Sequence, residues 1–293
     1  MQKIRYQKFN VKKYKNIFLL ITTIMIGFIA YKNSVSSLDK ESVIPSTTEN
    51  KPIIDITSSV TDSSLSKDIT YPSNVLNLSS WKITLPFGSD ERPVEIKQPE
   101  LSMYKINPWF MVTTQGNGVV FRAAVNGVTT SGSDYPRSEL REMTNNGKTS
   151  AEWSSNEGTH TMFLDQAITA VPKIKQQIVV GQIHDNDSDV IVIRLDYPYL
   201  HIRVDGKNVH TLDSEYQLGK RFTVSFVVKD DQTKVYYNNS IEPVYQLSQK
   251  YSDSYFKAGA YTQSNCDKEQ SILQCSTNNY GEVVIYKLEV IHQ

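Results

Sequence analysis

The sequence has few cysteines and no excess of charge of either sign. Only 2 of its 293 residues are cysteine, and 31 basic residues balance 31 acidic ones. A scaffold held mainly by disulfides needs more cysteine, and collagen-like, coiled-coil or disordered chains have other compositions. From residue 70 onward there are 21 basic and 25 acidic residues. Because nucleic-acid binding needs a broad basic surface, we expect no nucleic-acid partner.

The sequence also lacks an apolar run of the length that a membrane-spanning helix needs. Residues 17–31 carry no charge and follow a segment, 1–16, with six basic residues and no acid. A spanning helix needs about 20 apolar residues, whereas the core of a signal peptide needs about 7–15. Residues 1–32 are therefore predicted to be a signal peptide or an uncleaved N-terminal membrane anchor; a buried core helix is the less favoured alternative. The basic residues keep that end cytoplasmic, which predicts that the rest is exported.

Aromatic residues are missing from the segment that follows. Of residues 33–69, 14 of 37 are Ser or Thr. Such a composition cannot bury enough apolar surface to offset the entropy of ordering the chain. Residues 33–70 are therefore predicted to be a flexible linker between the N-terminal segment and a domain at 71–293.

The domain at 71–293 shows no long 3.6-residue period, no alternation of strands with helices, and no internal repeat. Short runs rich in Val, Ile, Tyr and Phe alternate with period 2, and Asp205-Gly206 and Asn238-Asn239 are candidate hairpin turns. This pattern predicts an all-β fold, a jelly-roll β-sandwich with a concave substrate groove. The clearest predicted strands are 177–184, 189–195, 199–206, 221–230, 234–239 and 282–291.

Three further segments place ionisable side chains on one face of a strand. In a strand, residues i, i+2 and i+4 share a face. If the three strands are neighbours, their polar faces form one groove that holds cations, an amide, a histidine and tyrosines. The residues concerned are Arg137, Glu139 and Arg141 in 135–143, Gln182 and His184 in 181–184, and Tyr255, Lys257, Gly259, Tyr261 and Gln263 in 255–263.

This set of side chains suits β-elimination from a polyuronate. Arginine binds a carboxylate with two parallel hydrogen bonds. Neutral histidine accepts a proton near pH 7, and tyrosine donates one. Glycoside hydrolysis instead uses two carboxylic groups, and the Glu-x-Asp-x-x-Glu strand motif of jelly-roll glucanases is absent from the sequence. Elimination needs no redox cofactor, and we expect neither a cofactor nor a catalytic metal.

The same segments resemble the signature of a known family. RSELR at 137–141, QIH at 182–184 and YFKAGAYTQ at 255–263, in this order and with WKITLP at 81–86, are similar to the alginate lyases of polysaccharide lyase family 7. The resemblance covers residues 71–293 and implies an alginate-cleaving enzyme. It implies that Arg137 and Gln182 neutralise the substrate carboxylate and that Glu139 orients the arginine.

The resemblance also implies the proton-transfer roles. His184 is then the general base and Tyr261 the general acid, with Tyr261 serving as both for one epimer. Ile183 is similar to the isoleucine of members that accept guluronate-containing blocks. The resemblance further implies that neighbouring sugar subsites are lined by Lys257, Arg141 and Gln263.

Other interpretations stay open at this point. Taken singly, the arginine segment is more typical of a surface ion-pair ladder, and His184 or Tyr261 of a structural residue. A jelly roll that binds acidic polysaccharide without cleaving it, or a lyase for another polyuronate such as glucuronan, is consistent with the same face. The other histidines show no constellation and are interpreted as non-catalytic: His160, His201, His210 and His292.

Two local features complete the expectations. Cys266 and Cys275 are predicted to form a disulfide in an exported domain, with two free thiols as the alternative. Residues 185–189 alternate acidic residues but lack the glycine and glutamate of an EF-hand loop. We predict that this segment is a loop that covers bound polymer, and that the protein is a monomer.

Overall fold

The computed structural model describes residues 69–293. The predicted signal or anchor at 1–32, and nearly all of the predicted linker at 33–70, lie outside the described residues. Within 69–293, no helix has the length and apolar character that a membrane span requires. Two short 3-10 helices, η2 (Pro72–Asn74) and η3 (Glu100–Met103), accompany the strands.

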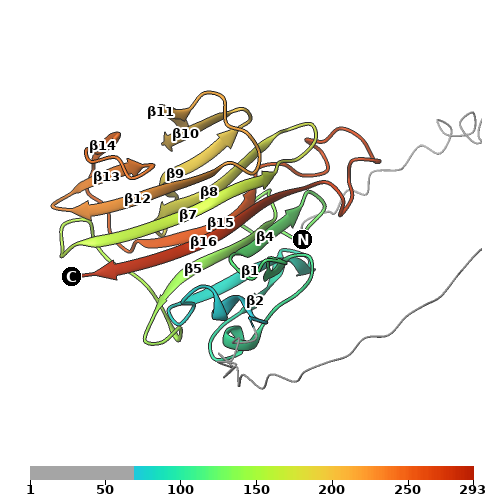
Figure 1. Ribbon diagram of the computed structural model, residues 1–293, viewed down its shortest axis with the longest axis horizontal. Helices are drawn as coiled ribbons and strands as arrows, with labels where there is room; N and C mark the ends of the chain where they lie inside the picture. Colours follow the sequence, from blue (N-terminus) through green and yellow to red (C-terminus); the bar gives the residue numbers. More distant parts are fainter. Residues whose placement is uncertain (1–68) are drawn as a thin grey trace, which may run out of the picture. The chain divides into compact units, whose positions relative to one another are not determined.

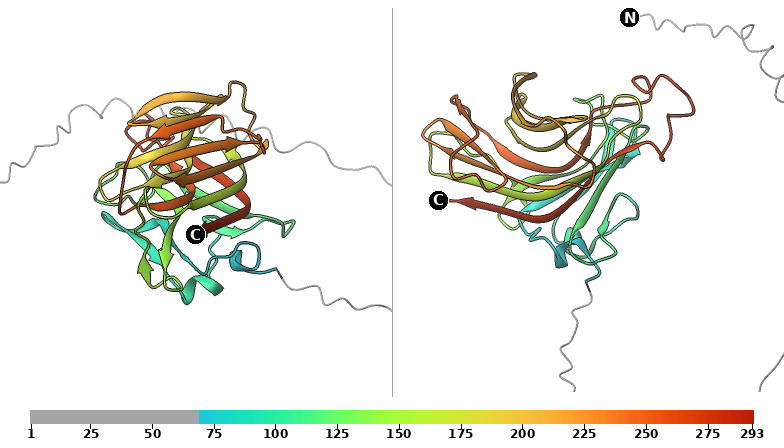
Figure 2. Two further views of the ribbon diagram at one scale, coloured as in Figure 1. Left: turned by 90° about the vertical axis from the view of Figure 1, so that its left-hand side faces the viewer. Right: turned by 45° about the horizontal axis from the view of Figure 1, so that its top comes forward.

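The described chain consists of two stacked antiparallel sheets (Figure 1), which Figure 2 shows as curved layers. The predicted all-β sandwich is confirmed. In spatial order, the nine-stranded first sheet contains β11 (Lys207–Asp213), β10 (Tyr199–Val204), β9 (Asp189–Asp196), β8 (Gln177–His184), β15 (Tyr255–Thr262), β5 (Arg137–Thr144), β1 (Trp81–Ser89) and β2 (Arg92–Ile96), with β6 (Thr149–Ser150) beside β5. The seven-stranded second sheet contains β14 (Tyr245–Ser248), β13 (Gln232–Tyr237), β12 (Arg221–Lys229), β7 (His160–Ala170), β16 (Tyr280–His292), β4 (Val119–Ala124) and β3 (Phe110–Val112).

Period-2 alternation places one side of each sheet in the core between them. In β12, every second residue from Phe222 to Val228 is buried, and the residues between are half-buried. Gly181 of β8 lies where the two sheets approach closely, because a Cβ added there would come within 2.8 Å of a Leu164 methyl carbon on β7. This close approach explains a glycine inside an otherwise apolar strand.

Tight turns connect several of the strands. Asp205 and Gly206 both have positive φ and join β10 to β11, which confirms the predicted hairpin. Asn238 and Asn239 also have positive φ, but they only begin a longer connection from β13 to β14. A two-residue turn that was not predicted from the sequence joins β12 to β13, where Asp230-Asp231 takes the left-handed conformation that Asp tolerates.

The connection from β15 to β16 carries the predicted disulfide. Cys266 and Cys275 are bonded, with their Cα atoms 4.7 Å apart, so the free-thiol alternative is wrong. The buried carboxylate of Glu269 anchors the same loop, because it accepts hydrogen bonds from the backbone N–H groups of Ile174 and Lys175 at 2.9 and 3.0 Å. The loop is thus tied to the segment before β8.

One expectation about the histidines needs correction. His160 and His292, interpreted as having no constellation, lie together beside Glu142 and Trp153. The two Nδ1 atoms are 2.7 Å apart, and His292 Nε2 is 2.5 Å from the Glu142 carboxylate. The Trp153 ring stacks on His160 at 4.4 Å and donates its N–H to Glu142. The sequence could not reveal this cluster because its members come from β5, β7, β16 and a loop.

Candidate active site

The three segments with polar faces lie side by side in the first sheet. β15 pairs with β5 on one side and β8 on the other. The register aligns Lys257 with Arg141 and with Gln182, and it aligns Tyr261 with Arg137. The predicted adjacency is therefore confirmed. The intervening residues face the core as expected, and Ile183 is fully buried.

A cleft of about 360 Å³ opens on the polar face of these strands. All four residues predicted to be catalytic line it, together with Gln263 of the predicted binding set. Glu139, Arg141 and Lys257 are not part of its lining. The lining residues are Gly132, Arg137, Val179, Gln182, His184, Asp187, Ser188, Asp189, Val192, Arg194, Arg203, Gly206, Tyr261 and Gln263.

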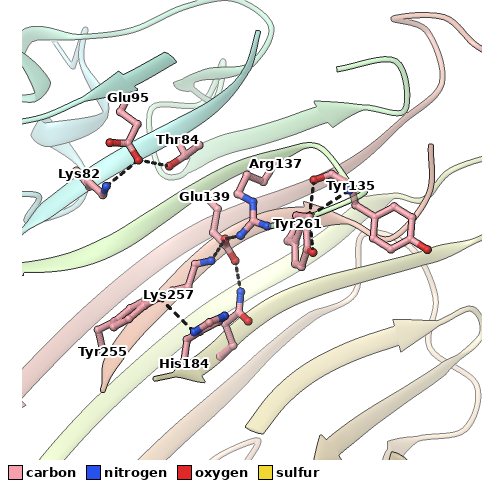
Figure 3. A network of polar contacts seen from close by, with 12 residues as sticks. Lys82, Thr84, Glu95, Tyr135, Arg137, Glu139, His184, Tyr255, Lys257 and Tyr261 are labelled. Atoms are coloured by element: carbon pink, nitrogen blue, oxygen red, sulfur yellow. Dashed lines mark hydrogen bonds and ion pairs between the residues drawn. The ribbon is translucent and has the colours of Figure 1, made fainter. Parts of the chain in front are cut away.

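Glu139 is the centre of a polar network (Figure 3). Its side chain is 1% exposed and receives three hydrogen bonds: Arg137 Nη1 at 3.0 Å and Lys257 Nζ at 2.8 Å on Oε2, and Gln182 Nε2 at 2.5 Å on Oε1. Burial raises the pKa of this carboxyl, but Lys257, Arg137 and the hydrogen bonds outweigh burial and hold the pKa below its usual range. An ionised Glu139 therefore fixes two of the predicted carboxylate-binding groups in one place.

Lys257 is a buried cation within this network. Its pKa is lowered to about 8, mainly by burial and also by repulsion from Arg137. The negative charge of Glu139 partly opposes this lowering. Two cations thus share one carboxylate, so the network carries an excess of positive charge beneath the cleft. An anionic ligand in the cleft would reduce that excess.

The contacts of His184 determine which ring nitrogen is free. Nδ1 is 2.5 Å from the backbone carbonyl oxygen of Asp185, which can only accept, so Nδ1 carries the proton. A neutral ring then has its lone pair on Nε2. Burial and the charge of Lys257 lower the pKa of His184 and favour this neutral form. His184 is therefore arranged as a proton acceptor.

Tyr255 supports His184 from the neighbouring strand. Its ring stacks on the imidazole at 5.4 Å, and its hydroxyl is 3.2 Å from Nδ1. The Arg141 guanidinium lies 3.8 Å from the centre of the Tyr255 ring and donates a hydrogen bond to the Glu142 carbonyl. The structure thus places Arg141 against Tyr255 rather than in the cleft lining.

Tyr261 and Tyr255 lie on opposite sides of Arg137 and Glu139 (Figure 3). Its hydroxyl is 2.8 Å from Ser133 Oγ, and the Arg137 guanidinium lies 3.9 Å from its ring centre. Gly259, two residues earlier, has φ +133, and a Cβ there would come within 2.6 Å of the Ser138 carbonyl oxygen. This position requires glycine, and a register irregularity between β15 and β8 spans it.

Gln263 follows the end of β15 and lies at another part of the cleft. Its Oε1 accepts from Arg194 Nη1 at 3.3 Å, and its Nε2 is buried without a hydrogen-bond partner among the described residues. The Nε of Arg137 is likewise buried without one. Buried polar atoms are normally paired, so these two atoms are among the exceptions in the described residues.

Comparison with known proteins agrees with this geometry. The family model described as alginate lyase matches residues 76–292. The chain belongs to the alginate lyase family. Members of this family are polysaccharide lyases, enzymes that break glycosidic bonds by elimination.

Individual relatives show how far the similarity extends. The crystal structure of an alginate lyase from Corynebacterium sp. is 48% identical, covers 76% of this chain and 99% of its own, and has a TM-score of 0.73. A variant of family 7 alginate lyase A1-II′, with a histidine and a tyrosine replaced, was solved in complex with substrate (GGMG). It is 28% identical over 76% of this chain and 97% of its own, with a TM-score of 0.64. An alginate lyase from Klebsiella pneumoniae is 37% identical over 82 residues, 27% of each protein.

Several residues of the site were given no role from the sequence. Tyr255 and Ser133 hold His184 and Tyr261, and Arg194 and Arg203 line the cleft. Tyr255 stands in one of the three polar segments, and both arginines alternate with apolar residues in predicted strands. Their alternation was a usable signal, whereas Ser133 is in a loop that carries no pattern.

The arrangement supplies each group that an elimination needs. Arg137 and Gln182 present donors, His184 presents a lone pair, and Tyr261 presents a hydroxyl. No group of three or more His, Cys, Asp or Glu side chains within residues 69–293 is arranged to hold a metal ion.

Proposed function

We propose that this protein cleaves alginate by β-elimination and leaves a 4-deoxy unsaturated uronate at the new chain end. The observation that carries the proposal is the convergence of Arg137, Gln182, His184 and Tyr261 on one cleft, with Glu139 beneath the first two. Membership in the alginate lyase family supports the substrate.

The proposed reaction assigns one task to each group. Arg137 and Gln182 bind the uronate carboxylate, which makes the hydrogen on the adjacent C5 more acidic. His184 Nε2 takes that proton, the C5 electron pair forms the C4=C5 double bond, and the C4–O bond breaks. Tyr261 gives its proton to the departing oxygen. Arg137 lines the cleft and has more donors than the one that pairs with Glu139, which supports a carboxylate ligand at this position.

The substrate complex of the A1-II′ relative is consistent with these roles, because it was obtained with a histidine and a tyrosine replaced. We propose further that the protein accepts guluronate-containing blocks, with Ile183 as the supporting residue. Since Ile183 faces the core, its effect on the substrate is indirect. Lys257 and Arg141 contribute to the site through Glu139 and Tyr255.

The test uses the full chain on alginate, with near-ultraviolet absorbance as the measure of unsaturated product. Absorbance should rise with wild type, and His184→Ala should lower turnover by about 10²–10⁴-fold, the usual contribution of a general base. His210→Ala is the matched control, because His210 does not line the cleft. Blocks rich in guluronate or in mannuronate then rank the epimer preference.

The same assay separates the alternatives. Binding of alginate without product would support a non-catalytic binding module. Neither binding nor product on alginate, with product on glucuronan, would support a lyase for another polyuronate. Undiminished activity of His184→Ala would show that the base is assigned to the wrong residue.

We also propose that the domain is exported and acts as a monomer. The uncharged run at 17–31 after six basic residues supports export, by a cleaved signal or a retained anchor. Sequencing the N-terminus of the mature protein distinguishes the two, and light scattering measures the oligomeric state.

A further inference from the structure

The cleft extends beyond the residues that the proposed reaction uses. Arg194 on β9 and Arg203 on β10 line it together with Gln182 and His184. Neither arginine has a task in the elimination, because Arg137 and Gln182 already bind the reacting carboxylate. These two further guanidinium groups in the same cleft are therefore candidates to bind another part of the substrate.

The strand register places these arginines relative to the catalytic residues. One row across the sheet aligns Arg137, Tyr261, Val179 and Arg194. A second row aligns Lys257, Gln182, Val192 and Arg203. In the first row, Val179 separates Arg194 from Tyr261. In the second row, Val192 separates Arg203 from Gln182. Neighbouring strands are about 4.8 Å apart, so Arg203 starts about 10 Å from Gln182 along the row. Arg203 is therefore displaced far enough from Gln182 to meet a different sugar of the same polymer.

The two arginines differ in how well their charges are neutralised. Arg194 Nε pairs with Asp196 at 2.6 Å, and its Nη1 donates to Gln263. Arg203 donates to the Gly206 carbonyl and forms no ion pair within the described part of the chain. Burial lowers the pKa of Arg203, and repulsion from Arg194 adds to it, with Asp196 and Asp189 only partly offsetting these effects. A half-buried cation without a paired carboxylate favours an anionic ligand.

We propose that Arg203, flanked by Arg194, binds the carboxylate of a second uronate, displaced from the reacting sugar toward β10. This inference rests on the proposed function and adds a specificity determinant to it. The ligand class is an uninterrupted polyuronate. A chain whose next sugar in that direction is neutral or esterified would leave Arg203 without its partner and would be cleaved less efficiently.

The test compares Arg203→Met with Lys207→Met, a cation on the adjacent strand that does not line the cleft. The full-length proteins are assayed on uronate oligomers of increasing length and on polymer. The wild-type to Arg203→Met ratio of kcat/KM should grow with length to about tenfold on polymer, the effect of one charge-assisted hydrogen bond. Lys207→Met should show no growth of this ratio. Arg203→Gln, which keeps donors without charge, serves if the methionine variant unfolds.

The outcomes separate this inference from the proposed function. If wild type forms unsaturated product and the ratio is the same at every length, the second carboxylate site is wrong and the lyase activity stands. The second site is also wrong if Lys207→Met behaves like Arg203→Met. If wild type forms no unsaturated product from any polyuronate, the proposed function fails, and the second site fails with it.

Discussion

Replacing Glu139 by Gln should disable the site through the loss of one charge. The carboxylate is 1% exposed and holds Arg137, Lys257 and Gln182 at 3.0, 2.8 and 2.5 Å. Glutamine has the same shape, but its single carbonyl oxygen replaces two charged acceptors, and its NH₂ group faces donors. The buried Lys257 and the partly buried Arg137 are left without a counter-charge.

The expected magnitude follows from this geometry. Removing one partner of a buried ion pair costs about 3–5 kcal/mol of unfolding free energy. Because Arg137 and Gln182 also lose their common anchor, kcat/KM should fall by more than about 100-fold, equivalent to about 3 kcal/mol of transition-state stabilisation. Glu95→Gln is the control: Glu95 pairs with Lys82 at 2.7 Å but is 35% exposed, and such pairs contribute about 0–1 kcal/mol.

Chemical denaturation and the absorbance assay measure the two quantities. The pKa of Glu139 is lowered in the fold, so its contribution to stability is present above the unfolded pKa and is lost as pH falls through the folded pKa. The difference in stability between wild type and Glu139→Gln should therefore shrink in acid. A variant within about 1 kcal/mol of wild type at neutral pH, with unchanged kcat/KM, would refute the role of Glu139 as the anchor.

Two further predictions concern other parts of the network. Lys257→Met removes a charge that lowers the pKa of His184, so the acid limb of the kcat/KM pH profile should move to higher pH. An acid limb that stays in place or moves to lower pH would contradict this electrostatic effect of Lys257 on His184. His292→Ala removes the hydrogen bond to Glu142 and should lower the unfolding free energy by about 1–2 kcal/mol while kcat on alginate is retained, because the cluster lies outside the cleft. Lost turnover in a stably folded His292→Ala protein would contradict the interpretation of this histidine as non-catalytic.

Much of the candidate site could be predicted because strands report which residues share a face. The alternation in 135–143, 181–184 and 255–263 separated Arg137, Gln182 and Tyr261 from core residues such as Leu140 and Ile183, and the structure agrees. It could not show that Glu139 is buried and holds three partners, since two of those partners come from other strands. The cluster of His160, His292 and Glu142 was invisible for the same reason.

The class of fold, the residues on each face and the chemistry of the polar face follow from the sequence alone. These properties depend on side-chain period and type, which are local. The folded chain was needed to show that β15 lies between β5 and β8, that Asp185 directs the proton of His184 to Nδ1, and that Arg203 joins the cleft. These depend on strand order and register, which arise from packing two whole sheets against each other and leave no trace in any single segment.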